Sequence, residues 1–232
     1  EGPNDKQLIG AGVHDVYGIG GDGFDICSIQ FAIHYMFESP ATLYNFLRNV
    51  AETTKLGGYF IGTSYDGQRI FDKLSGIKNG DSATIMDRNN ENKMWQVTKQ
   101  YDRDEFRSDS SSLGYAIDVY QESINKTFRE YLVNYDYLSG LLKNYGFEQL
   151  SREELKGKEL PNETDFKYVY ETSYMEKQSN KKGKSNRKME MDEGEKEISF
   201  LNRFFVYKKV RKVDAEKITA NMLEGEYISE EE

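Results

Sequence analysis

Two short segments of the sequence concentrate side chains that can stack, hydrogen-bond or carry charge. The first, QFAIHY at residues 30–35, follows the apolar run FDICSIQF at residues 24–31. The second, GTSYDG at residues 62–67, ends another apolar run. Function in sheets of parallel strands gathers beyond the carboxyl ends of the strands. We therefore expect these two segments to lie side by side on one rim of a sheet and to form the functional site.

The elements that would position these segments form a βαβ unit. Residues 24–31 follow a Gly-rich turn and have the pattern of a buried strand, and residues 59–64 have that of a second strand. The helix between them has apolar residues at i, i+3, i+4 and i+7, Ser39 as its cap, Pro40 in its first position, and Gly57 and Gly58 as its stop. This order predicts a parallel pair with a right-handed crossover and an α/β domain.

The rest of the chain predicts further strands and a helix, of which the β-rich middle would cover this rim, and it also contains two polar segments. KMWQVTK and LGYAIDVYQ alternate like antiparallel strands, a helix begins near Tyr135 and stops at Gly146, and ISFLNRFFVYKKV is the last strand. Residues 175–197 switch from basic to acidic with almost no core residues, which predicts a disordered insertion. Residues 213–232 form an acidic tail, whose last residues we expect to be frayed or a linker.

Composition limits the class of protein. With 232 residues and 37% hydrophobic side chains, the chain predicts one domain. The net charge of −9 disfavours extended binding of nucleic-acid phosphates by clustered cations, so any nucleic acid should be bound through a small local site. One cysteine and two histidines cannot build a Cys/His zinc site, and nothing supports a carboxylate-bound metal, so we expect no metal. No membrane-length apolar run or signal segment occurs, which predicts an intracellular protein without a membrane partner.

Three segments between about residues 24 and 207 resemble the mRNA cap guanine-N7 methyltransferases: FDICSIQFAIHYMFES, LRNVAETTKLGGYFIGTSYDG and SINKTFREYLVNY. Tyr65-Asp66-Gly67, where cellular members have a proline, looks more like the capping enzymes of large DNA viruses. The resemblance implies a class I S-adenosylmethionine-dependent (Rossmann-like) α/β fold with a β-rich lid over the cap. The chain does not begin with Met, and we expect a fragment of a longer polypeptide that lacks the first strands of this fold.

The resemblance also implies a set of residues for the cap guanine. A 7-methylated guanine is cationic and electron-poor, so aromatic rings attract its faces, and Phe31, Tyr35 and Tyr65 are the candidates. Glu130 of the Glu-Tyr-Leu-Val motif would accept from N1–H and the exocyclic amine, and His34 would donate to O6. A further family position falls on Asn202, although a shift in the alignment would place Phe204 there.

For the cofactor, S-adenosylmethionine, the resemblance implies only Gln30 and Tyr35, against its methionine moiety. The family's Gly-rich loop and the acidic residue that holds the ribose have no counterpart here, and Ala11 and Gly12 stand where the family has an Asp-containing pair near the adenine. GIGGDG at residues 18–23 precedes a strand instead of following one, which disfavours a nucleotide loop. We therefore expect the isolated chain to bind the cofactor negligibly.

The function implied is methyl transfer from S-adenosylmethionine to N7 of the 5′ guanosine cap of mRNA. N7 carries a free lone pair and no proton, so no catalytic acid or base is assigned. The partners would be the 5′ end of capped mRNA and other capping-enzyme domains of the same polypeptide, in the host cytoplasm or virion for a virus and the nucleus for a cell. The alternatives are a catalytically silent cap-binding or stimulatory module and a small-molecule methyltransferase. Taken singly, Phe31 and Tyr35 suit a core, His34 a structural role and Glu130 a solvated surface.

Overall fold

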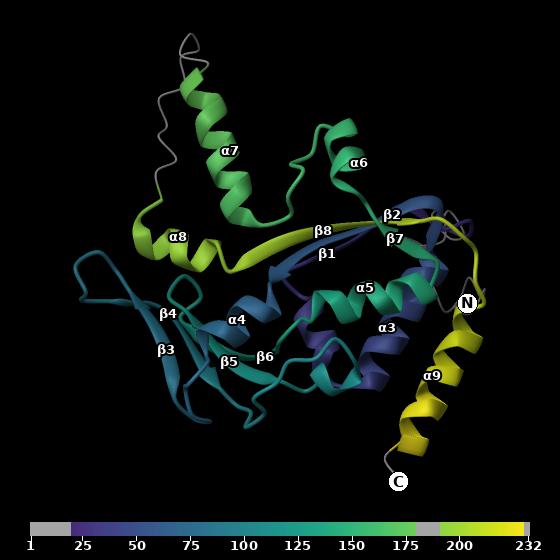
Figure 1. Cartoon of the computed structure of the whole chain (residues 1–232), viewed down its shortest axis with the longest axis horizontal. Coiled ribbons are helices and arrows are strands. Elements are labelled where there is room, and N and C mark those ends of the chain that lie inside the picture. The colour runs from purple at the N-terminus through teal and green to yellow at the C-terminus, as the bar shows by residue number, and fades with distance from the viewer. Residues whose placement is uncertain (1–19, 180–190, 230–232) are drawn as a thin grey trace, which may run out of the picture.

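The computed structural model describes residues 20–179 and 191–229, which form two four-stranded sheets with helices around them (Figure 1). Sheet A has the order β1 (Phe24–Gln30), β2 (Thr54–Tyr65), β8 (Asn202–Lys209) and β7 (Phe147–Gln149). β1 and β2 are parallel, whereas β8 is antiparallel to both β2 and β7. The parallel pair and its crossover confirm the predicted βαβ unit and the α/β class.

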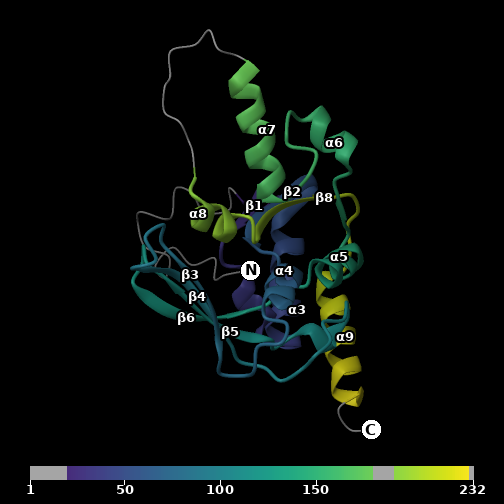
Figure 2. The ribbon, with the colours of Figure 1, turned by 60° about the vertical axis from the view of Figure 1, so that its left-hand side comes forward.

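Sheet B is an antiparallel meander built from the middle of the chain. Its strands run in sequence order: β3 (Ser82–Met86), β4 (Lys93–Lys99), β5 (Ala116–Gln121) and β6 (Lys126–Tyr131). The sequence predicted β4 and β5 as antiparallel strands, and the structure pairs them so. Both views place sheet B to one side of sheet A, below the short helix α8 (Glu193–Ser199) (Figure 2).

Helices cover sheet A unequally on its two faces (Figure 1). Helices α3 (Pro40–Thr53) and α5 (Tyr135–Asn144) pack on one face and enclose the larger core with Phe60 and Phe205 of the sheet. On the opposite face lies α6 (Arg152–Gly157), whose Leu155 packs near Val206 in a small cluster. The remaining helices are η1 (Ile33–Glu38), α4 (Gly67–Lys73), η2 (Ser110–Ser112), α7 (Phe166–Ser179) and α9 (Ala215–Ser229).

Helix α3 begins as the sequence predicts but ends earlier. The Ser39 hydroxyl accepts a hydrogen bond from the Thr42 amide at 3.2 Å, and Pro40 is the first helical residue. The helix ends at Thr53, and the chain enters β2 directly, so Gly57 lies inside the strand with φ +84° and does not stop the helix. The Lys209 ammonium of β8 donates to the carbonyl of Thr54 at 2.8 Å and also to that of Ala51, which satisfies carbonyls at this helix end.

Strand β1 is not the buried strand that its apolar sequence predicts. Among the described residues it forms the edge of sheet A, with β2 as its only partner. Phe24 and Ile26 are 52% and 58% exposed, whereas Cys27 and Ile29, on the other face of the strand, pack against the larger core. An apolar run shows that a strand suits a sheet, but the elements that pack on its faces decide which of its side chains are buried.

The two polar segments differ from their prediction where the structure describes them. Residues 180–190 of the predicted disordered insertion lie outside the described residues. Its two ends are helical: α7 runs to Ser179, and α8 begins at Glu193 after the N-cap residue Asp192, which forms a capping box with Glu195. The acidic tail contains α9, which packs on α3 with Ala215 and Thr219 buried. Over the described residues, no helix has the length and apolarity needed to cross a membrane.

Candidate functional site

The pairing of sheet A brings three strand ends to one rim. Gln30 ends β1 and pairs with Thr63 of β2, and Tyr65 ends β2. Because β8 runs antiparallel to β2, its first residue, Asn202, lies opposite Tyr65. The rim expected from the parallel pair therefore also receives a residue that is about 140 positions further along the chain.

A cavity of 640 Å³ opens at this rim, between sheet A and sheet B. This volume is within the range of about 300–1,000 Å³ that is usual for small-molecule sites. All six residues predicted to contact the substrate line the cavity, namely Phe31, His34, Tyr35, Tyr65, Glu130 and Asn202. The other lining residues come from β4, β5, β6, the β5–β6 turn and α8: Met94, Trp95, Val119, Gln121, Glu122, Ser123, Ile124, Phe128 and Ile198.

Phe31 reaches the cavity through an unusual backbone conformation. Its φ is +51°, in the left-handed region that a bulky residue rarely adopts, and its amide donates to the Thr63 carbonyl at 2.8 Å. The turn holds the ring 54% exposed at the cavity. Strained residues of this kind cluster at functional sites, at a cost of roughly 1–3 kcal/mol each. Local strain and an exposed ring both favour binding over core packing for Phe31.

His34 and Glu130 face each other inside the cavity. Nδ1 of His34 lies 3.7 Å from Oε2 of Glu130, and both side chains are buried. Burial lowers the pKa of His34 to about 4 and raises the pKa of Glu130 to about 7. The distance meets the criterion for an ion pair, yet both pKa shifts favour uncharged forms. The effect of burial on the two pKa values outweighs the attraction between the two groups, because 3.7 Å is too long for a hydrogen bond.

Three buried polar atoms in the cavity have no hydrogen-bond partner within the described part of the chain. They are Nε2 of His34, Oε2 of Glu130 and Oδ1 of Asn202. The other end of the Asn202 side chain is fixed, because Nδ2 donates to the carbonyls of Ile198 and Ser199 at 3.1 and 3.2 Å. Unpaired buried polar atoms cost free energy, which a ligand with complementary groups recovers. The cavity is therefore suited to a planar ligand that carries both donors and acceptors.

The residues of the Tyr65-Asp66-Gly67 segment have separate tasks. Asp66 caps α4 by accepting from the Gln68 amide at 3.1 Å, and it pairs with Arg203 at 3.2 Å. Gly67 is required by space, because a Cβ there would lie 2.3 Å from the Val133 carbonyl oxygen. Only Tyr65 of the three lines the cavity. Asp66 and Gly67 thus fix the end of β2 from which Tyr65 projects.

Sequence reasoning missed the part of the wall that sheet B contributes. Trp95 and Gln121 line the cavity and hydrogen-bond to the Tyr65 hydroxyl. Strand alternation places both on the same face of sheet B, since Trp95 pairs with Gln121 in the register of β4 and β5. Their alternation could have shown that they share a face, but not which face turns toward the rim of sheet A.

Gln30 does not join the other predicted residues. Its amide donates to the Ser28 hydroxyl at 2.8 Å and accepts from the Thr63 hydroxyl at 2.7 Å, and it lines a separate apolar groove of 340 Å³. Tyr35, the other predicted cofactor contact, lines the 640 Å³ cavity at the rim. The described residues therefore do not by themselves fit an S-adenosylmethionine site. They also contain no cluster of three or more His, Cys, Asp or Glu placed to hold a metal.

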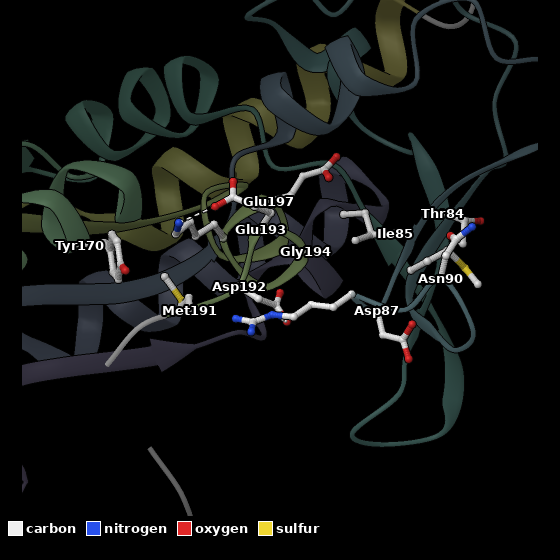
Figure 3. Close-up of a pocket in the computed structure, with 13 residues that line it drawn as sticks. Thr84, Ile85, Asp87, Asn90, Tyr170, Met191, Asp192, Glu193, Gly194 and Glu197 are labelled. Atoms are coloured by element: carbon white, nitrogen blue, oxygen red, sulfur yellow. Dashed lines mark hydrogen bonds and ion pairs between the residues drawn. The ribbon is translucent and has the colours of Figure 1, made fainter. Parts of the chain in front are cut away.

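A larger cavity of 960 Å³ is lined by residues of β3, the turn after it, α7 and α8 (Figure 3). Its charged lining residues already have partners: Arg88 pairs with Asp192 at 3.2 Å, and Glu197 pairs with Lys73. None of its lining atoms belongs to the buried, unpartnered set of the described residues. The smaller cavity at the rim is thus the better candidate for a ligand site.

Comparison with known proteins gives the same family as the motifs. Residues 13–210 match the family model described as "mRNA (guanine-N(7))-methyltransferase domain". The "Probable mRNA-capping enzyme" of Acanthamoeba polyphaga mimivirus is 29% identical over 212 residues, which is 84% of this chain and 18% of that protein. The "mRNA cap guanine-N(7) methyltransferase" of Saccharomyces cerevisiae is 30% identical over 131 residues, or 55% of this chain and 29% of that protein. The matches thus span less than a third of these relatives.

Solved structures give a weaker likeness. The CcbJ methyltransferase from Streptomyces caelestis matches with a TM-score of 0.43 and 11% identity, over 83% of this chain and 59% of that one. A S-adenosylmethionine-dependent methyltransferase from Clostridium acetobutylicum matches with a TM-score of 0.39 and 15% identity, over 81% and 58% of the two chains.

Proposed function

Since this chain belongs to the mRNA (guanine-N7)-methyltransferase family, we propose that it carries the guanine-binding part of a site that methylates N7 of the 5′ guanosine cap of mRNA. The observation that carries the proposal is the set of unpartnered atoms of His34, Glu130 and Asn202 in one aromatic-walled cavity. S-adenosylmethionine, the methyl donor that the family implies, would supply the methyl group.

Two of the three unpartnered atoms, those of Glu130 and His34, have a complement on guanine. Ionised Glu130 would accept from N1–H and the exocyclic amine together, the pairing that its buried carboxylate lacks in the free protein. Nε2 of His34 would donate to O6 as a neutral imidazole, which its lowered pKa favours. Phe31 and Tyr35, 54% and 42% exposed, would cover the faces of the base. The aromatic contacts strengthen once N7 is methylated, because the base is then a cation.

The residues position the base and do not transfer its proton. N7 has a lone pair ready to attack, so a general base has no task there. The rate would come from holding guanine in one orientation toward the methyl donor, which converts a bimolecular encounter into an oriented one. His34 is accordingly a positioning residue, and its pKa of about 4 makes it a poor proton donor at neutral pH.

The cavity would recognise the base and not the phosphates. Among its described lining residues there is no Lys or Arg. The triphosphate would therefore point out of the cavity, to be held by residues elsewhere in the complete polypeptide. This arrangement agrees with the net charge of −9, which predicts that nucleic acid is bound only through a small local site.

The proposal can be tested through Trp95, the only tryptophan of the chain, because it lines the cavity. We expect 7-methyl-GTP and GTP to quench its fluorescence, with 7-methyl-GTP the tighter ligand and ATP at least about tenfold weaker than GTP. Because phosphate contacts are not expected, 7-methylguanosine should bind about as well as 7-methyl-GTP. Equal binding of ATP and GTP would contradict the proposal.

Methyl transfer itself is tested in the complete polypeptide with a capped RNA and S-adenosylmethionine. We expect transfer to N7 of the cap guanine. If guanine binding is present and the complete polypeptide transfers no methyl group, the chain is a silent cap-binding module and the catalytic part of the proposal is wrong.

A further inference from the structure

The hydroxyl of Tyr65 is held by two donors from sheet B. Nε1 of Trp95 donates to it at 3.0 Å and Nε2 of Gln121 at 2.9 Å. The Trp95 side chain is 1% exposed, and its ring meets the Tyr65 ring edge-on at 6.3 Å between centroids. These contacts join the end of β2 to two strands of sheet B and fix the oxygen at the cavity wall.

The two hydrogen bonds decide what the hydroxyl can still offer. An indole N–H can only donate, and the Gln121 amide nitrogen also donates here, so the Tyr65 oxygen acts as an acceptor twice. Its remaining capacity is its own O–H. Among the described residues no acceptor is placed to receive that proton, although the oxygen is at a cavity wall.

The hydroxyl keeps its proton at any physiological pH. Burial, and to a smaller extent the negative charge of Glu130, raise the pKa of Tyr65 to about 12. Tyr65 lines the same cavity as Glu130, the carboxylate assigned to N1–H and the amine of guanine. On guanine, O6 is the acceptor next to N1–H.

We propose that the Tyr65 hydroxyl donates a hydrogen bond to O6 of the bound guanine, and that Trp95 and Gln121 are positioning residues that aim it. The inference rests on the guanine site proposed above. O6 has two lone pairs, so Tyr65 and His34 can both donate to it. Tyr65 then reads the edge of the base, and the stacking role expected from the sequence is left to Phe31 and Tyr35.

The test compares the binding of GTP with that of ATP, 6-thio-GTP and ITP by titration calorimetry with the 232-residue chain. 6-Thio-GTP keeps N1–H and the amine of GTP but replaces O6 by sulfur, a weaker acceptor, and ITP lacks only the amine. Tyr65→Phe removes the hydroxyl and keeps the ring. Gln121→Glu is nearly isosteric but turns a donor into an acceptor that draws the Tyr65 proton away from the ligand.

We expect the preference of the wild-type chain for GTP over 6-thio-GTP to fall by about three- to tenfold in both variants, the size of one neutral hydrogen bond. The preference for GTP over ITP, which reports on Glu130, should not change. Tyr120→Phe is the matched control, because Tyr120 precedes Gln121 on β5 and its hydroxyl instead donates to Asn125 at 3.2 Å. This variant should behave as the wild type.

The outcomes separate this inference from the function it rests on. If the wild-type chain does not prefer GTP to ATP, the guanine site itself is wrong. If it does, and Tyr65→Phe leaves the preference for GTP over 6-thio-GTP unchanged, Tyr65 acts through its ring alone and the inference fails. A loss of preference in Tyr65→Phe with none in Gln121→Glu would overturn the positioning role of Gln121.

Discussion

Oε2 of Glu130 lies 3.7 Å from Nδ1 of His34, and the pair is held apart from water without forming a fixed ion pair. Burial raises the pKa of Glu130 to about 7, so near neutral pH its protonated and ionised forms are both populated. A ligand that offers two N–H donors would draw the carboxylate into its ionised form. Glu130 is therefore the residue on which the proposed guanine site depends most.

Replacing Glu130 by alanine should abolish most of the recognition of guanine. The N1–H and amine groups would be left without an acceptor in a partly dried cavity, which costs on the order of 2–4 kcal/mol. In the complete polypeptide, kcat/KM for cap methylation should fall by roughly 30- to 1,000-fold. Glu130→Gln should lose a comparable amount, because it offers one acceptor oxygen where the carboxylate offers two.

Affinity of the complete polypeptide for S-adenosylmethionine should stay the same in both variants, since the proposed contact of Glu130 is with guanine and not with the cofactor. Glu148→Gln, at an exposed position of β7, is the control and should methylate caps normally. A Glu130→Ala enzyme with near-normal cap methylation would show that this buried carboxylate does not bind the substrate.

The same Glu130→Gln variant should be more stable than the wild type at alkaline pH. The pKa of Glu130 is about 7 when folded and near 4.5 when unfolded, so the unfolded chain loses this proton first. The wild type therefore loses stability as pH rises from about 4.5 through 7, by roughly 2–3 kcal/mol for a shift of this size in a mostly buried group.

Urea unfolding of both proteins between pH 5 and pH 8 measures this effect. The stability advantage of Glu130→Gln should grow from pH 5 to about pH 7 and level off above that. His34 acts in the opposite direction, because its lowered pKa costs stability as pH falls from 6.5 through 4. A constant difference between the two proteins at all pH values would mean that Glu130 has an ordinary pKa.

Substitutions at Phe31 separate the cost of its strained backbone from the contribution of its ring to ligand binding. With φ at +51°, glycine should fit this position better than alanine, and Phe31→Gly should be about 0.5–1 kcal/mol more stable than Phe31→Ala. Both variants remove the ring, so both should weaken 7-methyl-GTP binding by the roughly 1–3 kcal/mol typical of base stacking. Thermal unfolding and Trp95 fluorescence measure the two effects. Equal stability of the variants would show that the backbone at Phe31 is relaxed.

Local patterns predicted the parts of the site that lie close to their own strands. Phe31, His34 and Tyr35 follow β1 directly, and Tyr65 ends β2, so strand order and the parallel crossover place them on one rim. Glu130 and Asn202 came from the motif and the family alignment, because no local pattern ties β6 or β8 to that rim.

The contacts that could not be predicted join elements far apart in the chain. Trp95 and Gln121 are 30 and 56 residues from Tyr65, and nothing in their own strands indicates that partner. The exposure of Phe24 and Ile26 depends likewise on which elements pack on their face of β1, and not on their own apolar character. The packing of α9 could not be predicted from its polar composition, since only a narrow stripe of that helix contacts the core.

The apolar side chains of α9 that contact the core should contribute to the stability of the fold. Ile218 and Met222, one helical turn apart, pack against the larger core, and the Thr219 hydroxyl lies 2.7 Å from that of buried Tyr145. Ile218→Asp should therefore cost about 2–3 kcal/mol, since it places a charge against apolar side chains. Ala220→Asp makes the same charge change on the exposed side of the helix and should cost less than about 0.5 kcal/mol. Urea unfolding at pH 7 gives both values, and Trp95 fluorescence shows whether guanine binding survives, as we expect because α9 is not among the elements that line the cavity. If the two variants unfold alike, the segment is the loose acidic tail that its composition suggests.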